Sequence, residues 1–235
     1  MLEIRSKNDR GMTKLSWLDS RHTFSFADYY DPGFMGFSEL RAINDNIVAP
    51  REGFGAYRHD NMEIVTIVLS GQMEHKDNLG NTTIISPREV QRMTTGTGMI
   101  YSEMNPSLSR AAHFLQIWVL PQELNLNPEY EKKEFLPSSL LNQMCLIVSP
   151  TGKNNSLRIH QNVNIFQCVL EEDRSVHFQM KPSRHVWLQI AEGAIEANSL
   201  YLKAGDGLAI TEETGVLKLK GLERRSNFVV FDLPN

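Results

Sequence analysis

Short segments in which apolar and polar residues alternate recur along almost the whole chain, separated by turn-forming residues. Because successive side chains of a β-strand point to opposite faces of a sheet, this period of two predicts strands that are buried on one face. The clearest examples are residues 62–71, 112–120, 163–170, 185–193 and 227–233. Many short strands at this spacing indicate an all-β protein built from sandwiches, with few short helices.

One turn between two such segments has a clear local cause. The sequence KDNLGN at 76–81 supplies Asn and Gly, which tolerate the positive φ angles of tight turns. It therefore predicts a hairpin over residues 62–86.

A segment near the middle of the chain interrupts the strand pattern. Residues 127–144 combine charged side chains, two prolines and a Ser-Ser-Leu-Leu run that favours a short helix. Strand-like runs that end in Gly occur on both sides of it, which indicates a weak internal duplication. We therefore expect two β-sandwich domains, residues 1–126 and 145–235, joined by a linker at 127–144.

Charge and hydropathy narrow the classes of partner. The formal net charge is −4, without a long run of one sign, so the positive field that supports direct binding to nucleic acid is missing. No run of about 18 apolar residues occurs, and the first residues lack an apolar signal region. We expect a cytoplasmic protein without a membrane partner. Cys145 and Cys168 lack a CxxC spacing and are predicted to be free core thiols.

Two segments place chemically active side chains at strand spacing. Tyr57, His59 and Glu63 stand at positions i, i+2 and i+6, so on a single strand they would share one face. Tyr101 and Glu103 have the same i, i+2 relation about forty residues later. Two strands that each offer two inward side chains can close a pocket with four ligands.

These residues lie in motifs that resemble those of a known family. The segments GFGAYRHDNMEIV (53–65) and VQRMTTGTGMIYSEMN (90–105) resemble the two cupin motifs as they occur in pirins. The segments RHTFSFADYYDP (21–32) and QIWVLP…NPEY (116–130) fit the same pattern. The resemblance implies a bicupin of the shorter bacterial kind: two jelly-roll domains, of which only the N-terminal one carries a metal motif.

In pirins, three histidines and one glutamate hold a single iron or another divalent metal ion. Carried over by position, these ligands fall on Tyr57, His59, Tyr101 and Glu103. Two imidazoles are thus replaced by phenols. Neutral imidazole suits Fe(II), Ni and Cu, whereas a phenol must first lose a proton with a pKa of about 10.

Three alternatives follow for the metal. In the first, no metal binds, and the two tyrosines fill the cavity and form hydrogen bonds with Glu103 or His59. In the second, two phenolates, one imidazole and one carboxylate bind Fe(III), a hard ion that favours anionic oxygen ligands. In the third, His59 and Glu103 retain weak binding of a divalent ion whose shell is completed by water. Of the three, we predict the first, in which no metal binds.

For several bacterial pirins, the resemblance implies oxygen-dependent cleavage of flavonols such as quercetin, in which Glu103 or Glu63 could act as the base. Because two imidazoles are replaced, we predict instead a small-molecule-binding or regulatory protein that lacks the usual metal. Its expected partners are a small aromatic molecule and an unidentified protein. The alternative is a quercetin 2,3-dioxygenase-type oxidoreductase with an atypical Tyr/His/Tyr/Glu iron site.

Overall fold

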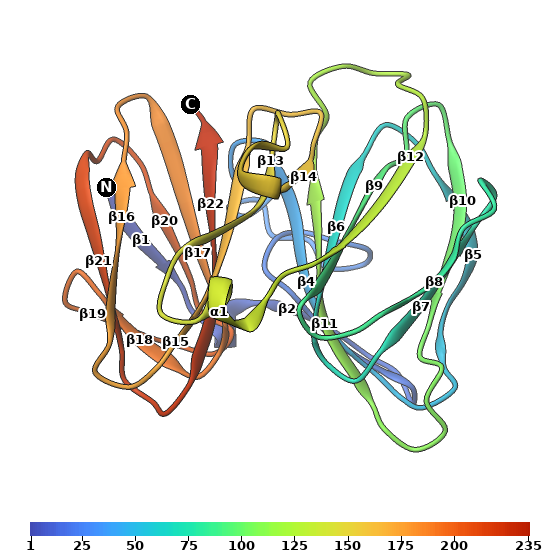
Figure 1. The fold of residues 1–235 in the computed structure, drawn as a ribbon, viewed down its shortest axis with the longest axis horizontal. Coiled ribbons are helices and arrows are strands. Elements are labelled where there is room, and N and C mark those ends of the chain that lie inside the picture. Colours follow the sequence, from blue (N-terminus) through green and yellow to red (C-terminus); the bar gives the residue numbers. More distant parts are fainter. The chain divides into compact units, whose positions relative to one another are not determined.

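The computed structural model describes residues 1–235 and consists mainly of antiparallel β-strands, which confirms the all-β prediction (Figure 1). The chain divides into two compact units, each completed by a segment from elsewhere in the sequence. The N-terminal unit consists of Gly11–Glu134 and Leu157–Gln161, and the C-terminal unit of Met1–Arg10, Phe135–Ser156 and Asn162–Asn235. No helix has the length and apolar character that a membrane span requires.

Two antiparallel sheets form the N-terminal unit and enclose its core. The larger sheet contains, in order of pairing, β12 (Glu129–Glu134), β9 (Glu89–Thr94), β6 (Glu63–Ser70), β11 (Ala112–Val119), β4 (Leu40–Val48), β3 (Leu18–His22) and β2 (Gly11–Lys14). The smaller sheet contains β5 (Gly53–His59), β10 (Met99–Met104), β7 (Met73–Asp77) and β8 (Thr82–Ile85). Buried side chains from the two sheets pack together, as Val48 and Phe114 do with Met73 and Ile85. The unit is therefore a β-sandwich.

The C-terminal unit also consists of two antiparallel sheets, with a hydrophobic cluster between them. Its larger sheet contains β1 (Leu2–Arg5), β20 (Gly207–Ile210), β17 (Arg184–Glu192), β22 (Ser226–Pro234), β15 (Asn164–Leu170) and β13 (Cys145–Ser149). Its smaller sheet contains β16 (Ser175–Met180), β21 (Gly215–Gly221), β18 (Ala194–Ala197) and β19 (Leu200–Lys203). One hydrophobic cluster, which includes Leu188, Phe228 and Val230, fills the space between these strands. The two sandwiches confirm the expected bicupin fold.

The segment 127–144, expected to be a linker, is largely built into the fold. β12 pairs with β9 along its whole length. α1 (Pro137–Leu140) follows at the position where the sequence favours a short helix. The charges that suggested a linker belong to a strand at the edge of the sheet, where Lys132 forms an ion pair with Glu89 at 2.8 Å. Charged side chains are typical of such edges because they discourage pairing with another chain.

The units also differ from the expected boundaries of 1–126 and 145–235. β1 pairs with β20, so the first ten residues belong to the C-terminal unit. Residues 157–161 belong to the N-terminal unit, where the Gln161 side chain donates to the Leu120 carbonyl at 2.8 Å. The remaining short elements are η1 (Lys7–Asp9), η2 (Lys153–Asn155) and β14 (Leu157–Arg158). Local sequence patterns do not encode pairing between residues about 200 positions apart.

The Asn- and Gly-containing turn forms a hairpin between β7 and β8. Asp77 organises this turn, because its Oδ1 accepts hydrogen bonds from the backbone N–H groups of Leu79 at 2.9 Å and Asn81 at 3.0 Å. Its Oδ2 accepts a hydrogen bond from His75 Nε2 at 2.9 Å, and both of these side chains are fully buried. The hairpin is shorter than the predicted 62–86, since β6 belongs to the other sheet.

We expect Asp77→Ala to lower the free energy of unfolding by roughly 2–3 kcal/mol, because it leaves a buried imidazole and two turn amides without their acceptor. Urea denaturation measures this change. Asp60→Ala is the matched control, since Asp60 is half exposed and pairs only with the exposed Arg58, and it should change stability by less than about 0.5 kcal/mol. Equal effects of the two substitutions would contradict the role of Asp77.

Candidate ligand site

Three of the four predicted site residues meet where β5 and β10 pair. Tyr57 stands directly opposite Tyr101 in the register of the two strands, as His59 does opposite Met99. The Tyr57 hydroxyl donates a hydrogen bond to the Tyr101 hydroxyl at 3.0 Å, and the Tyr101 hydroxyl lies 3.4 Å from His59 Nδ1. The i, i+2 spacing therefore placed these side chains on one face, and pairing of the strands brought them into contact.

The two phenols are neutral at physiological pH. Burial raises the pKa of Tyr57 and of Tyr101 well above the ordinary value of 10, and the neighbouring Glu103 carboxylate adds to the shift in both. Burial has the opposite effect on an imidazole and lowers the pKa of His59, so this side chain is also uncharged. The cluster thus consists of uncharged rings joined by hydrogen bonds.

Glu103 is fully buried, and its carboxylate takes its hydrogen bonds from the facing sheet. Thr66 on β6 and Gln91 on β9 donate to Oε1 at 3.3 and 2.7 Å. Gln116 on β11 donates to Oε2 at 2.5 Å. Burial raises the pKa of Glu103 to about 7, and the three donated hydrogen bonds oppose this rise. The sequence predicts that the tyrosines form hydrogen bonds with Glu103 or His59. Neither tyrosine donates to Glu103, and the Tyr101 hydroxyl pairs with His59 instead.

The prediction that Glu63 shares the face of Tyr57 and His59 is wrong. β5 ends at His59, and Asn61, with a φ of 51°, lies in the turn that leads to β6 in the other sheet. Glu63 stands three residues before Thr66 on β6, so the two side chains point to opposite faces of the sheet. Glu63 accepts a hydrogen bond from Thr94 at 3.1 Å, and burial raises its pKa to about 7.

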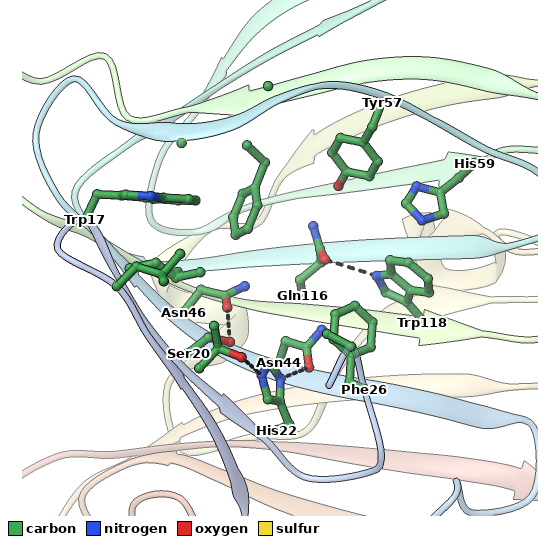
Figure 2. A pocket seen from close by; sticks show the side chains of 17 residues that line it. Trp17, Ser20, His22, Phe26, Asn44, Asn46, Tyr57, His59, Gln116 and Trp118 are labelled. Atoms are coloured by element: carbon green, nitrogen blue, oxygen red, sulfur yellow. Dashed lines mark hydrogen bonds between the residues drawn. The ribbon is translucent and has the colours of Figure 1, made fainter. Parts of the chain in front are cut away.

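A cavity of about 450 Å³ opens beside Tyr57 and His59 in the N-terminal unit (Figure 2). It is lined by aromatic side chains, by polar uncharged ones and by a few small or aliphatic residues, and no Asp, Glu, Lys or Arg contributes to it. The aromatic and polar lining residues beyond the predicted ones are Trp17, Phe26, Phe54, Trp118, Thr13, Ser20, His22, Asn44, Asn46 and Gln116. Tyr101 and Glu103 are not among the lining residues, and Gln116 lies between Glu103 and the cavity.

Sequence reasoning did not identify the polar residues that hold Glu103 or those that line the cavity with Tyr57. A signal for two of them was present, because Thr66 and Gln116 each interrupt an apolar run at a position whose neighbours are buried. Buried polar side chains in a strand need hydrogen-bond partners, so such interruptions indicate a polar network. Asn44 and Asn46 are also buried polar residues, but Asp45 stands between them on β4 and no apolar run surrounds them.

The four family positions do not fit a divalent metal ion held by imidazoles. Both carboxylate oxygens of Glu103 already accept hydrogen bonds, and the phenols of Tyr57 and Tyr101 keep their protons and bind each other. Among these four positions, only His59 offers an uncharged imidazole. In the whole structure, no group of three or more His, Cys, Asp or Glu side chains is arranged to hold a metal ion.

Comparison with known proteins relates both units to characterised sequences and structures. The family model described as Pirin matches residues 4–119, and that described as Quercetinase C-terminal cupin domain matches residues 146–233. A protein of Escherichia coli K12 named quercetin 2,3-dioxygenase is 40% identical over 235 residues, covering 100% of this chain and 99% of the relative. This chain therefore extends along the whole length of that relative.

Solved structures give the same result. The crystal structure of YhhW from Escherichia coli is similar with a TM-score of 0.95 and 40% identity, covering 100% of this chain and 98% of that one. A structure described as bacterial pirin YhhW in complex with nickel(II) has a TM-score of 0.93 and 40% identity, with 100% and 99% coverage.

The buried Glu103 gives stability a defined pH dependence. A carboxyl group whose pKa is higher in the folded than in the unfolded protein stabilises the fold while protonated, so its contribution is complete below its ordinary pKa of 4.5 and is lost as the pH rises through about 7. We expect Glu103→Gln to remove a pH-dependent loss of unfolding free energy on the order of 3 kcal/mol between these limits.

Urea denaturation between pH 4.5 and 8 measures this dependence. Glu172→Gln, at an exposed position, is the control and should leave the pH profile of the wild type unchanged. A Glu103→Gln profile as steep as that of the wild type would contradict the assignment.

Proposed function

The chain belongs to the pirin family of bicupin proteins, and we propose that it acts as a small-molecule-binding protein that does not use the metal of that family. The observation that carries this proposal is the hydrogen bond between the hydroxyls of Tyr57 and Tyr101 at two of the four ligand positions. A phenol that is buried and hydrogen-bonded to a second phenol has no charge to offer a cation. We propose that the pair stands where the family has two imidazoles, and that it satisfies its own polar groups by pairing.

The cavity supports the binding of a small aromatic molecule. Trp17 and Phe54 meet edge to face with ring centroids 5.4 Å apart, and Phe26 and Trp118 do so at 5.0 Å. Such rings offer apolar faces to a flat ligand. The cavity volume of about 450 Å³ lies within the range of pockets for small molecules, about 300–1,000 Å³. We propose that a ligand lies among these rings, with Tyr57 and His59 at one end.

The names of the relatives suggest flavonol cleavage, but the residues of this chain support binding more than turnover. Cleavage of the quercetin type needs a metal that binds the substrate oxygens and a base that accepts a proton. Glu103 is separated from the cavity by Gln116, and Glu63 lies on the opposite face of the sheet from the Glu103 network. Neither carboxylate is therefore placed to accept a proton from a ligand in the cavity.

Metal binding tests this proposal directly. We expect wild-type protein, purified without a chelating column, to be colourless and to take up neither nickel nor iron in stoichiometric amounts. The double substitution Tyr57→His and Tyr101→His restores two imidazoles and should confer binding of one nickel ion per chain, measured by calorimetry and metal analysis. The nickel complex of YhhW makes this ion the appropriate one to use.

Added histidines can bind nickel non-specifically, so a matched control is required. Tyr30→His with Tyr201→His places two histidines at exposed positions, 71% and 60% exposed, and should not create a stoichiometric site. A visible charge-transfer band and bound Fe(III) in the wild type would overturn the metal-free proposal and favour the iron site with two phenolates. A folded double variant that binds no metal would instead show that the assignment of ligand positions is wrong.

A further inference from the structure

The cavity carries a second polar group on the side away from Tyr57 and His59, formed by residues of β2, β3 and β4 (Figure 2). Asn44 and Asn46 alternate along β4 and therefore point to the same face. Ser20 donates a hydrogen bond to Asn46 Oδ1 at 2.6 Å, and His22 Nδ1 lies 2.7 Å from Asn44 Oδ1. Thr13 holds the other ring nitrogen of His22 at 2.9 Å.

These hydrogen bonds involve the side-chain oxygen of each asparagine. The side-chain nitrogen of each asparagine takes no part in them. Neither Asn44 Nδ2 nor Asn46 Nδ2 has a hydrogen-bond partner within the protein, although both residues are only 2% exposed and line the cavity. Ser20 and His22 fix the two amide planes, so the N–H groups cannot rotate away without breaking those bonds. Because both residues line the cavity, a bound molecule can supply an acceptor for these N–H groups.

The charge of the lining decides which acceptor fits. The cavity has no Lys or Arg side chain to compensate an anion, and moving a carboxylate or phosphate among aromatic rings without a counter-charge is costly. A ketone, lactone or ether oxygen accepts from amide N–H groups without carrying a charge. The same rings that disfavour an ion pack well on a flat, uncharged ligand.

We propose that the paired amides of Asn44 and Asn46 form an anchor that donates hydrogen bonds to one uncharged oxygen of a flat aromatic ligand and so fixes which end of the ligand faces Tyr57. This inference rests on the proposed small-molecule function. It adds which chemical group of the ligand the cavity prefers. The anchor offers only donors to the ligand, whereas the other end presents the phenol of Tyr57 and the imidazole of His59. The two ends of the cavity are therefore chemically different, and a ligand with its oxygen at one end has one preferred orientation.

Three probes with the same ring and nearly the same shape test the anchor. They are 2-acetylnaphthalene, with a carbonyl acceptor, 2-isopropenylnaphthalene, with a methylene group in its place, and 2-naphthoate, with a carboxylate. Fluorescence titration gives the dissociation constant of each. We expect the ketone to bind roughly tenfold more tightly than the alkene, as one hydrogen bond provides, and the carboxylate to bind more weakly than the ketone by at least a similar factor.

Substitutions then assign the preference to the amides. Asn44→Leu with Asn46→Leu should reduce the ratio between ketone and alkene to about one. Asn46→Asp is a second test, because it keeps the acceptor for Ser20 while it removes the donor, and it should also lower the preference for the ketone. Phe26→Leu is the matched control: it removes part of the aromatic wall and should weaken all three probes alike while their ratios stay unchanged. Thermal melts followed by circular dichroism establish that each variant is folded.

The outcomes separate this inference from the function on which it rests. Equal affinity of the wild type for ketone and alkene, or tighter binding of the carboxylate, would overturn the anchor while small-molecule binding stands. A ratio that persists in the folded Asn44→Leu, Asn46→Leu variant would overturn it as well. Failure of all three probes to bind the wild type would overturn both the anchor and the proposed aromatic ligand.

Discussion

The carboxylate of Glu103 joins the two sheets of the N-terminal unit, and the arrangement of the candidate site depends on it. It extends from β10 in the smaller sheet and accepts hydrogen bonds from Thr66, Gln91 and Gln116, which stand on three strands of the larger one. A buried carboxylate is tolerated only with such donors around it. Because Gln116 is held by Glu103 on one side and accepts a hydrogen bond from Trp118 on the other, the same contacts fix part of the cavity wall.

The uncharged tyrosine pair follows from this arrangement. With the oxygens of Glu103 committed to amide and hydroxyl donors, a cation would have to compete with three hydrogen bonds for its carboxylate ligand. Two phenols remove that competition, since they pair through their own hydroxyls, with their rings tilted by 50° and the ring centroids 4.7 Å apart. The interior keeps its polar groups satisfied without an ion. The fold of the N-terminal unit thus accommodates two buried phenols side by side.

Much of the fold could be predicted from local sequence, and the failures have definite physical causes. Period-two alternation identified the strands, and the spacing of Tyr57 and His59 identified their common face, because both depend only on backbone geometry. Glu63 was misplaced because the turn after His59 is not encoded by alternation, which continues in register across it. The Asn44 and Asn46 anchor was missed because its partners come from strands more than twenty residues away.

The two units also differ in how much of the chain the ribosome must synthesise before all segments of the unit are present. The N-terminal unit uses residues 157–161, so a ribosome that has released residue 134 has not yet supplied all of its parts. The first ten residues wait still longer, because β1 pairs with β20 at residues 207–210. A chain that folds as it emerges must therefore keep its earliest segment unpaired until nearly the last strand is made. The C-terminal unit thus combines the first ten residues of the chain with segments made after residue 134, although each unit has its own core.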